Sequence, residues 1–181
     1  MDTFELVEKW IAEDKFRFKC LMIAREYFEQ DWFLAAGFVR NIVWDKLQGH
    51  KEMTALNDID LIYFNPSCIS KEQDQIVEEA LNAEMPKCNW SVKNQARMAL
   101  NHGHDPYLDC IEAMSYWPEV QTAIGVTLLK EGGIRVRSPF SAHDVVRLAA
   151  TRNLKCTSNA FNSRLAKKGW EKLWPELAIE T

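Results

Sequence analysis

The stretch NDIDLIYF, residues 57–64, constrains the fold of this chain more than any other. Its apolar residues are typical of a buried strand, yet Asp58 and Asp60 stand at its start. Side chains alternate faces along a strand, so both aspartates point the same way, roughly 6.6 Å apart along the chain. Two like charges on one face of a buried strand repel and lower stability. The pair therefore indicates either a solvated strand edge or a site for a divalent cation.

The length and composition are those of an ordinary soluble domain. The chain has 181 residues, of which 47% are hydrophobic and 27% charged, and this is enough to build one core. Acidic residues are mixed through the N-terminal stretch, unlike a signal peptide, and no segment approaches the roughly 20 apolar residues of a membrane span. Five widely spaced cysteines without a CxxC pair are typical of reduced thiols. We therefore expect a cytoplasmic protein without membrane contact.

The charge pattern argues against a long nucleic acid as partner. The net charge is −4, which excludes a globally basic binder. Residues 130–172 nevertheless contain ten Lys or Arg and three Asp or Glu, a local excess of +7. Two interpretations are open for this region: a surface for phosphates or an acidic partner, and a solvated helical face. The same two interpretations apply to Arg164, Lys167 and Lys168 within it.

Apolar periodicity predicts a mixture of helices and strands, in an α+β or α/β fold with a mixed sheet. Helices are expected over 2–13, 15–30, 38–49, 70–84, 108–116, 141–150 and 159–169, with a helical turn at 94–100. Strands are expected over 32–37, 58–64 and 89–93, and a hairpin with a Gly132-Gly133 turn over 121–138.

Three features around the two aspartates suit a nucleoside triphosphate. Gly37 ends the first strand and lets a phosphate approach the backbone closely. The helix that follows presents free N–H groups and the positive end of its dipole to an anion, and Arg40, one turn into it, could reach the same phosphate. A hard cation such as Mg²⁺ binds a few carboxylates together with phosphate oxygens, so its presence between Asp58 and Asp60 would make their placement favourable.

A polar cluster follows the third strand and leaves two interpretations open. Strand ends border ligand crevices in sheets of this kind, so the cluster could contact substrate. Alternatively, Asn94 caps the next turn and Arg97 pairs on the surface. The cluster consists of Lys93, Asn94, Gln95 and Arg97.

Tryptophans also have two open roles. Most are expected in core or interface packing, although one could stack on a base. The tryptophans to which both interpretations apply are Trp44, Trp90, Trp117, Trp170 and Trp174. Exposed aromatic side chains would also support a homodimer.

The stretch LAAGFVRNIVWDKLQG followed by NDIDLIYF resembles the signature of the DNA polymerase beta-type nucleotidyltransferase superfamily. It is particularly similar to the Gly-Gly-x-Val-Arg-Asp and Asp-x-Asp motifs of CCA-adding enzymes and bacterial poly(A) polymerases. More closely, the chain resembles a family of small bacterial nucleotidyltransferase-like proteins. In that family DIDLIYF, WSVKNQARM, PY, WPE, a hairpin and a terminal GW...WP occur in this order. The resemblance extends from about residue 32 to the C-terminus.

This resemblance implies a single nucleotidyltransferase-like domain over 1–181, with a mixed sheet flanked by helices. The core would cover 31–140, with helical segments at 1–30 and 141–181. It also implies transfer of a nucleoside monophosphate from an NTP to an acceptor that the sequence does not identify, with release of pyrophosphate. Asp58 and Asp60 would be the catalytic residues and the ligands of Mg²⁺ (or Mn²⁺). The nucleotide- and phosphate-binding residues would be Gly37, Phe38, Arg40, Lys93 and Asn94.

The sequence departs from the superfamily pattern at two points. Ala36 replaces the first glycine of the motif, and Phe38 stands where many members have serine. The third carboxylate of the superfamily is missing from the strands NWSVKN and TAIGVTLLK. The nearest later acids lie in a loop and a helix: Asp105, Asp109 and Glu112. The alternative is therefore a weak or inactive nucleotidyltransferase fold that serves as a nucleotide-binding or protein-interaction module.

Overall fold

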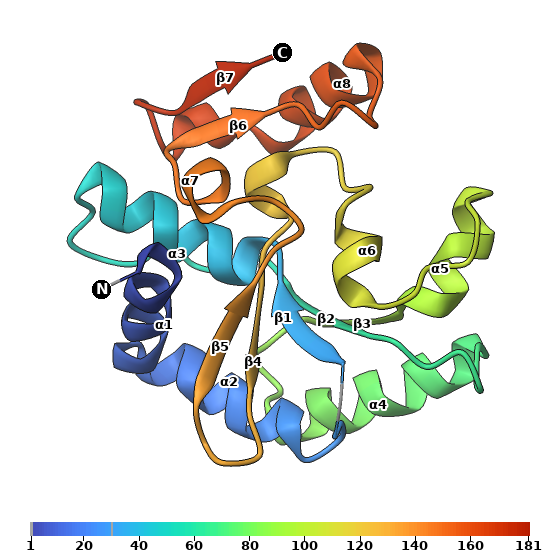
Figure 1. Ribbon diagram of the computed structural model, residues 1–181. Helices are drawn as coiled ribbons and strands as arrows, with labels where there is room; N and C mark the ends of the chain where they lie inside the picture. The colour runs from blue at the N-terminus through green and yellow to red at the C-terminus, as the bar shows by residue number, and fades with distance from the viewer. Residues whose placement is uncertain (1, 30) are drawn as a thin grey trace.

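A five-stranded mixed sheet forms the centre of the protein in the computed structural model, which describes residues 2–29 and 31–181 (Figure 1). Its strands are β1 (Trp32–Ala35), β2 (Ile59–Tyr63), β3 (Trp90–Asn94), β4 (Gly125–Leu128) and β5 (Ile134–Arg137), in the order β3-β2-β1-β4-β5. β1 runs antiparallel to β2 and β4, whereas β2 and β3 are parallel. β4 and β5 form the expected hairpin. This mixed sheet flanked by helices confirms the expected α+β class.

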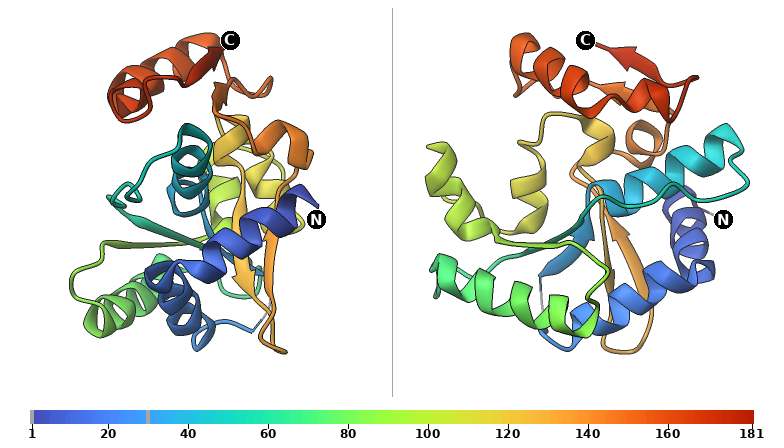
Figure 2. Two further views of the ribbon diagram at one scale, coloured as in Figure 1. Left: turned by 90° about the vertical axis from the view of Figure 1, so that its left-hand side faces the viewer. Right: turned by 180° about the vertical axis from the view of Figure 1, so that it is seen from behind.

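Helices cover the two faces of the sheet unequally (Figure 2). The helices against the first face are α1 (Thr3–Glu13), α2 (Lys15–Arg25), α3 (Gly37–Gln48) and α4 (Lys71–Glu84). Those on the second face are α5 (Gln95–His102) and the short α6 (Cys110–Met114). α2 ends earlier than expected, and residue 30 of the expected helix lies outside the described residues. The second face is therefore the thinly covered one.

Alternation along β1 assigns side chains to these two faces. Leu34 packs in the large core beneath the first face. Phe33 packs instead with Ile62 of β2 and Met114 of α6 on the second face. Because Ala35 is in register with Asp60, the aspartate also lies on the second face. The thin cover on this side leaves space at the sheet for a polar site.

The C-terminal segment differs from the helical segment expected for residues 141–181. Its elements are α7 (Ala142–Val145), the strand β6 (Ala149–Thr151), α8 (Ser158–Lys168) and the strand β7 (Ala178–Glu180). The helix expected over 141–150 is wrong beyond the single turn of α7, because β6 pairs in parallel with β7. The partner strand comes about thirty residues later in the chain, so no local pattern indicates the pairing.

Aromatic packing fixes the C-terminal segment on α3. The indoles of Trp170 and Trp174 meet Trp44 of α3 edge-on, with ring centroids 5.3 and 5.0 Å away. Trp174 Nε1 also donates a hydrogen bond of 2.8 Å to the buried carboxylate of Asp45. The same carboxylate accepts hydrogen bonds from the backbone N–H and the hydroxyl of Thr54. Asp45 thus joins α3, the loop before β2 and the end of the chain.

Two features bear on the expected cellular setting, namely the length and apolar character of the helices and the state of the cysteines. Within residues 2–29 and 31–181, none of the helices has the length and apolar character needed to cross a bilayer. The five cysteines are free thiols.

Gly125 is required by the close approach of β1 to β4. A Cβ at this position would lie 2.8 Å from the Cβ of Phe33, an atom that is fixed to its backbone. Gly125→Ala is therefore expected to lower the free energy of unfolding by about 1–3 kcal/mol, measured by urea denaturation. Gly133→Ala is the control, because its Cβ would meet Leu129 Cδ1 at an ordinary 3.7 Å. Equal losses in both variants would contradict this explanation.

Candidate functional site

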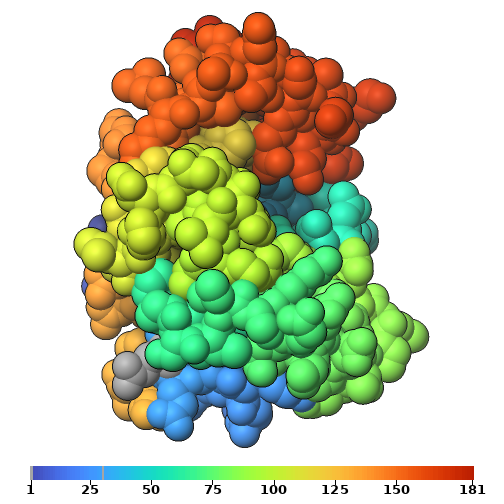
Figure 3. Space-filling model, turned by 90° about the vertical axis from the view of Figure 1, so that its right-hand side faces the viewer, coloured from blue at the N-terminus to red at the C-terminus, as the bar shows by residue number. Residues whose placement is uncertain are grey.

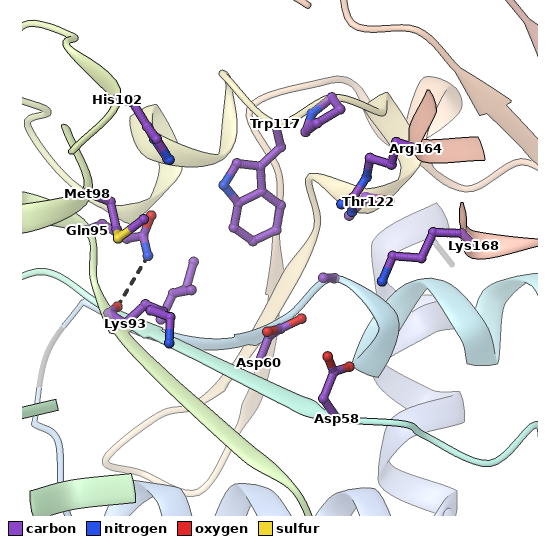
Figure 4. Close-up of a pocket in the computed structure, with 13 residues that line it drawn as sticks. Asp58, Asp60, Lys93, Gln95, Met98, His102, Trp117, Thr122, Arg164 and Lys168 are labelled. Carbon is purple, nitrogen blue, oxygen red and sulfur yellow. Dashed lines mark hydrogen bonds between the residues drawn. The ribbon is translucent and has the colours of Figure 1, made fainter. Parts of the chain in front are cut away.

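Asp58 and Asp60 lie at the start of β2 and point into the same hollow over the second face of the sheet (Figure 4). Asp60 is in register with Ala35 of β1 and with Ser91 of β3. Both aspartates are partly exposed. The shared orientation expected from strand alternation is therefore present, and the pair borders a cavity instead of being enclosed in the core.

The surroundings of Asp60 disfavour its ionised form. Burial, and after it the charge of Asp58, raises the pKa of Asp60 to about 6. The cations of Lys168, Arg40 and Lys93 act in the opposite direction without cancelling the effect. A bound cation would therefore relieve a repulsion that the protein alone leaves in place.

Two adjoining cavities meet above the aspartates, and together we call them the cleft. The α5 cavity, of about 350 Å³, is lined on its outer side by Ile62, Lys93, Gln95, Met98, His102 and Trp117. The α3 cavity, of about 300 Å³, extends over Gly37, Arg40, Asn41 and Trp170. Both cavities share Ala36, Asp58, Asp60, Arg164 and Lys168. Figure 3 shows the cleft as a hollow between the orange C-terminal segment and the yellow-green region of α5 and α6.

The turn from β1 into α3 forms part of the shared wall. Ala36 has a φ of 53° and a ψ of −122°, a backbone conformation that favours glycine. Its N–H donates to the carbonyl of Ile124, which fixes the turn beside β4. α3 then begins at Gly37, and the N–H groups of a helix's first turn lack partners within the helix. The cleft is therefore lined by a helix N-terminus next to the two carboxylates.

Arg40 is part of the wall of the cleft and is only 7% exposed. Its guanidinium contacts the indoles of both Trp44 and Trp170, at 4.8 and 4.4 Å from their ring centroids. It also donates hydrogen bonds to Thr122 Oγ1 and Asn41 Oδ1, at 3.1 and 2.8 Å. Burial lowers the pKa of Arg40 to about 10, so it stays charged at neutral pH.

The side chains of two expected binding residues point away from the cleft. Phe38 is fully buried in the core of the first face, under the guanidinium of Arg17. Asn94 is buried as well, and its side chain caps α5 by accepting a hydrogen bond from the N–H of Ala96. Because neighbouring residues of a strand face opposite sides, Lys93 lines the cleft and Asn94 does not. A phosphate-binding role for the side chains of Phe38 and Asn94 thus has no support in their positions.

The structure separates the roles of three basic residues on α8 for which two interpretations were open. Arg164 and Lys168, one turn apart, line both cavities. Lys167 between them is exposed and lines neither. Their spacing of four residues was the available signal, but only the position of α8 over β2 reveals which side of the helix faces the cleft.

Other residues of the α5 cavity come from positions that the sequence singled out only weakly. Trp117 lines the cavity and is partly exposed, whereas four other tryptophans are buried: Trp44, Trp90, Trp170 and Trp174. Gln95 of the polar cluster also lines the cavity, while Arg97 pairs with Asp74. Thr122 had no signal in the sequence and lies at the cleft because a 3₁₀ turn, Val120–Thr122, precedes β4.

The carboxylates of Asp58 and Asp60 are ligands of the type that a hard divalent cation binds, and such a cation would need further oxygen ligands from outside the protein. In the part of the chain that the structure describes, no group of three or more His, Cys, Asp or Glu is arranged to hold a metal ion. The residue beside Asp60 on β3 is Ser91. Asp109 instead caps α6, where it accepts from the N–H of Glu112. Among the described residues, Asp58 and Asp60 are thus the carboxylates that line the cleft, without a third beside them.

Comparison with known proteins identifies the family. A family model described as Nucleotidyltransferase matches residues 23–179. The chain belongs to this nucleotidyltransferase family. It is also 28% identical to a solved structure described as "The NMR structure of the protein reveals a CCA-adding enzyme head domain". That match has a TM-score of 0.83 and covers 97% of this chain and 94% of the other.

None of the curated proteins compared with this nucleotidyltransferase matches it. Its family and fold support nucleotidyl transfer as the general chemistry. Asp60 lies in β2 of the mixed sheet, and Asp58 directly precedes that strand.

Replacing Asp60 should stabilise this nucleotidyltransferase when metals are removed by EDTA. The raised pKa means that the native protein binds a proton more tightly than the unfolded chain between pH 3.8 and about 6, so the wild type loses stability as the pH rises through that window. Asp60→Asn removes this loss. We expect the variant to be about 1–3 kcal/mol more stable at about pH 7.5 and nearly equal at about pH 4, by urea denaturation.

Asp105→Asn, at an exposed loop position, is the control and should change stability little at either pH. An Asp60→Asn difference of the same size at both pH values would show that its cause is not the charge.

Proposed function

We propose that the protein transfers a nucleoside monophosphate from an NTP to an acceptor hydroxyl or phosphate and releases pyrophosphate. The observation that carries this proposal is the arrangement of charges in the cleft. Two carboxylates on β2 lie opposite Arg164 and Lys168 of α8, and the start of α3 borders the same space. A triphosphate with a divalent cation has the charges that this arrangement attracts.

The start of α3 supports binding of phosphate groups. The positive end of the helix dipole and the N–H groups of the first turn favour an anion there. Gly37, which lines the α3 cavity, has no side chain to keep a phosphate away from these N–H groups. Arg40 adds a positive charge in the wall beneath them.

Asp58 and Asp60 would hold the cofactor, Mg²⁺ or Mn²⁺. Their oxygens are the ligands such cations prefer, and phosphate oxygens and water would complete the coordination. The chemistry that the bound cation supplies is neutralisation of charge on the phosphate oxygens. Asn at both positions would keep the shape of the site and remove its negative charge.

In the reaction, the acceptor oxygen bonds to the α-phosphorus while the bond from this phosphorus to the oxygen bridging to the β-phosphorus breaks. Pyrophosphate leaves with that electron pair, and the proton of the acceptor passes to water. The residues of the cleft orient the triphosphate and stabilise the negative charge of the leaving group. These two effects need fixed cations at the cleft wall, which Arg164 and Lys168 provide.

The size of the cleft favours a small acceptor group. Cavities of about 350 and 300 Å³ are in the range that holds small molecules. A long RNA is disfavoured by the net charge of −4. The free cysteines suit the reducing conditions of the cytoplasm.

A second candidate function is nucleotide binding without turnover. It is favoured by the missing third carboxylate, since Ser91 stands beside Asp60 on β3. In this case the cleft would hold an NTP and its cation, and the protein would act as a sensor or adaptor.

Binding of the four NTPs with Mg²⁺ or Mn²⁺ tests both candidates. The wild type is expected to bind at least one NTP in a metal-dependent way, because Asp58 and Asp60 need the cation to accept a triphosphate beside them. The double variant Asp58→Asn/Asp60→Asn should lose this binding. Isothermal titration calorimetry measures binding, and a pyrophosphate-release assay with cell extract as the source of acceptor measures turnover.

Metal-dependent binding with pyrophosphate release, both lost in the double variant, would support the transferase. Binding without release supports the second candidate. No binding of any NTP by the wild type would contradict both.

Gly37→Ala tests the phosphate position next to α3. A Cβ there would lie at ordinary contact distance, 3.5 Å, from Arg40 Nη2, so the fold should keep its stability in urea. The added methyl group would hold a phosphate away from the helix N–H groups. We expect NTP binding to weaken by about tenfold, or 1.4 kcal/mol. Unchanged affinity would show that the triphosphate does not touch this backbone.

A further inference from the structure

Glu119, the acidic residue of the WPE stretch, is completely buried behind Arg164, a residue that lines the cleft. Its Oε1 accepts a hydrogen bond of 2.5 Å from Nε of Arg164 on α8. Among the surrounding charges it is also the one that most favours the ionised form of Arg40 in α3. Its Oε2 is buried without a hydrogen-bond partner within the described residues. Burying a carboxylate in this way is costly, so the position needs a functional explanation.

The contact with Glu119 determines how Arg164 faces the cleft. The hydrogen bond from Nε of Arg164 to Glu119 holds the inner side of the guanidinium. The side chain of Arg164 nevertheless remains 35% exposed and lines both cavities. Lys168 lies one turn later and also lines both. Figure 4 shows the two side chains extending from α8 on the far side of the cavity, with Lys168 directed toward the aspartates.

Arg40 is less available for a ligand than these two residues. Two of its nitrogens donate to Thr122 and Asn41, and the buried guanidinium contacts two indoles. It is therefore committed to joining α3 to the C-terminal segment. Of the residues that the two cavities share, Arg164 and Lys168 are the cations.

We infer that Arg164 and Lys168 form a clamp for the polyphosphate part of the nucleotide, and that Glu119 is the positioning residue that orients Arg164. The inference rests on the proposed function, because it takes an NTP as the ligand. A guanidinium held at Nε presents its two terminal amino groups, which match a phosphate group in a bidentate way. The lysine adds a point charge one turn away.

The clamp also offsets the negative charge of the two aspartates, so that the cleft can accept a negatively charged polyphosphate beside them. The polyphosphate would lie between α8 and the start of α3, with the α-phosphate at Asp58 and Asp60. The clamp reaches the ligand from the C-terminal segment and the helix N-terminus reaches it from the core, so the two parts of the chain close on the same group.

Affinity for tripolyphosphate, measured by calorimetry at a fixed excess of Mg²⁺, tests the clamp without a base or an acceptor. Arg164→Ala and Lys168→Ala should each weaken binding by about tenfold, as expected for a lost charge-assisted hydrogen bond. Lys167→Ala is the matched control, because it removes the same charge from the same helix outside both cavities. Its affinity should stay within about twofold of the wild type. An equal loss in Lys167→Ala and Lys168→Ala would overturn the clamp, because it would mean a general effect of basic charge.

A double-mutant cycle tests the role of Glu119. If Glu119 acts through Arg164, then Glu119→Ala should weaken tripolyphosphate binding nearly as much as Arg164→Ala, and the double variant should lose no more than Arg164→Ala alone. Losses that add would overturn the positioning role. The Nε–H proton resonance of Arg164 gives a second readout: it should be protected from exchange in the wild type and lose that protection in Glu119→Ala.

Glu119→Gln replaces this variant if Glu119→Ala does not fold, because the amide oxygen can still accept from Arg164 Nε while the charge is gone. An intermediate loss of affinity is then expected, and wild-type affinity together with unchanged Nε–H protection in this variant would overturn the requirement for the carboxylate.

The result also separates this inference from the proposed function. If the wild type binds neither tripolyphosphate nor any NTP, the proposed function fails and the clamp with it. If the wild type binds both and Arg164→Ala binds them equally well, the clamp alone is overturned.

Discussion

The contact of the Arg40 guanidinium with the indoles of both Trp44 and Trp170 is the interaction on which the cleft depends. Arg40 and Trp44 belong to α3, whereas Trp170 belongs to the C-terminal segment, so this contact joins two parts of the chain. The hydrogen bond from Trp174 to Asp45 strengthens the same junction from the other side of the indole cluster. Because α8 ends just before Trp170, this junction determines where its basic side chains lie.

Carboxylates line one side of the cleft and basic side chains line the other. On one side, burial and a neighbouring carboxylate raise the pKa of Asp60. On the other side, Arg164 and Lys168 line the cavity, with Arg164 anchored to Glu119 by one nitrogen. A ligand that carries a cation and several phosphate oxygens satisfies both sides at once. This is the physical reason to favour a metal-bound nucleotide over a neutral small molecule.

Local sequence patterns predicted the strands of the central sheet. They also predicted that the two aspartates stand at the start of one strand and share one face. The apolar run after Asp58 is β2, the alternation around Gly132-Gly133 is the hairpin, and the helix expected over 70–84 is α4, with Ser70 as its N-cap. The turn at the motif also formed where it was expected. Ala36, which stands where the resembled motif has glycine, takes a φ of 53° there, a backbone conformation that glycine adopts more readily than alanine.

The sequence could not predict features that depend on contacts between distant segments. β6 and β7 pair across about thirty residues, and a helix was therefore expected in place of β6. Lys93 and Asn94 were treated alike, although strand alternation turns only Lys93 to the cleft. The basic residues of α8 and the buried Glu119 acquire a role only once the tryptophan cluster has brought α8 over β2. Long-range packing decided these cases except that of Lys93 and Asn94, for which the alternation of side chains along β3 was a local signal.

The most direct test of the central claim is a crystal structure with Mn²⁺ and a nucleoside triphosphate analogue that cannot be cleaved at the α-phosphate. We predict an anomalous Mn²⁺ peak at the carboxylates of Asp58 and Asp60, with the polyphosphate between the start of α3 and the side chains of Arg164 and Lys168. A nucleotide bound outside the cleft, or a cation bound away from the two aspartates, would contradict it.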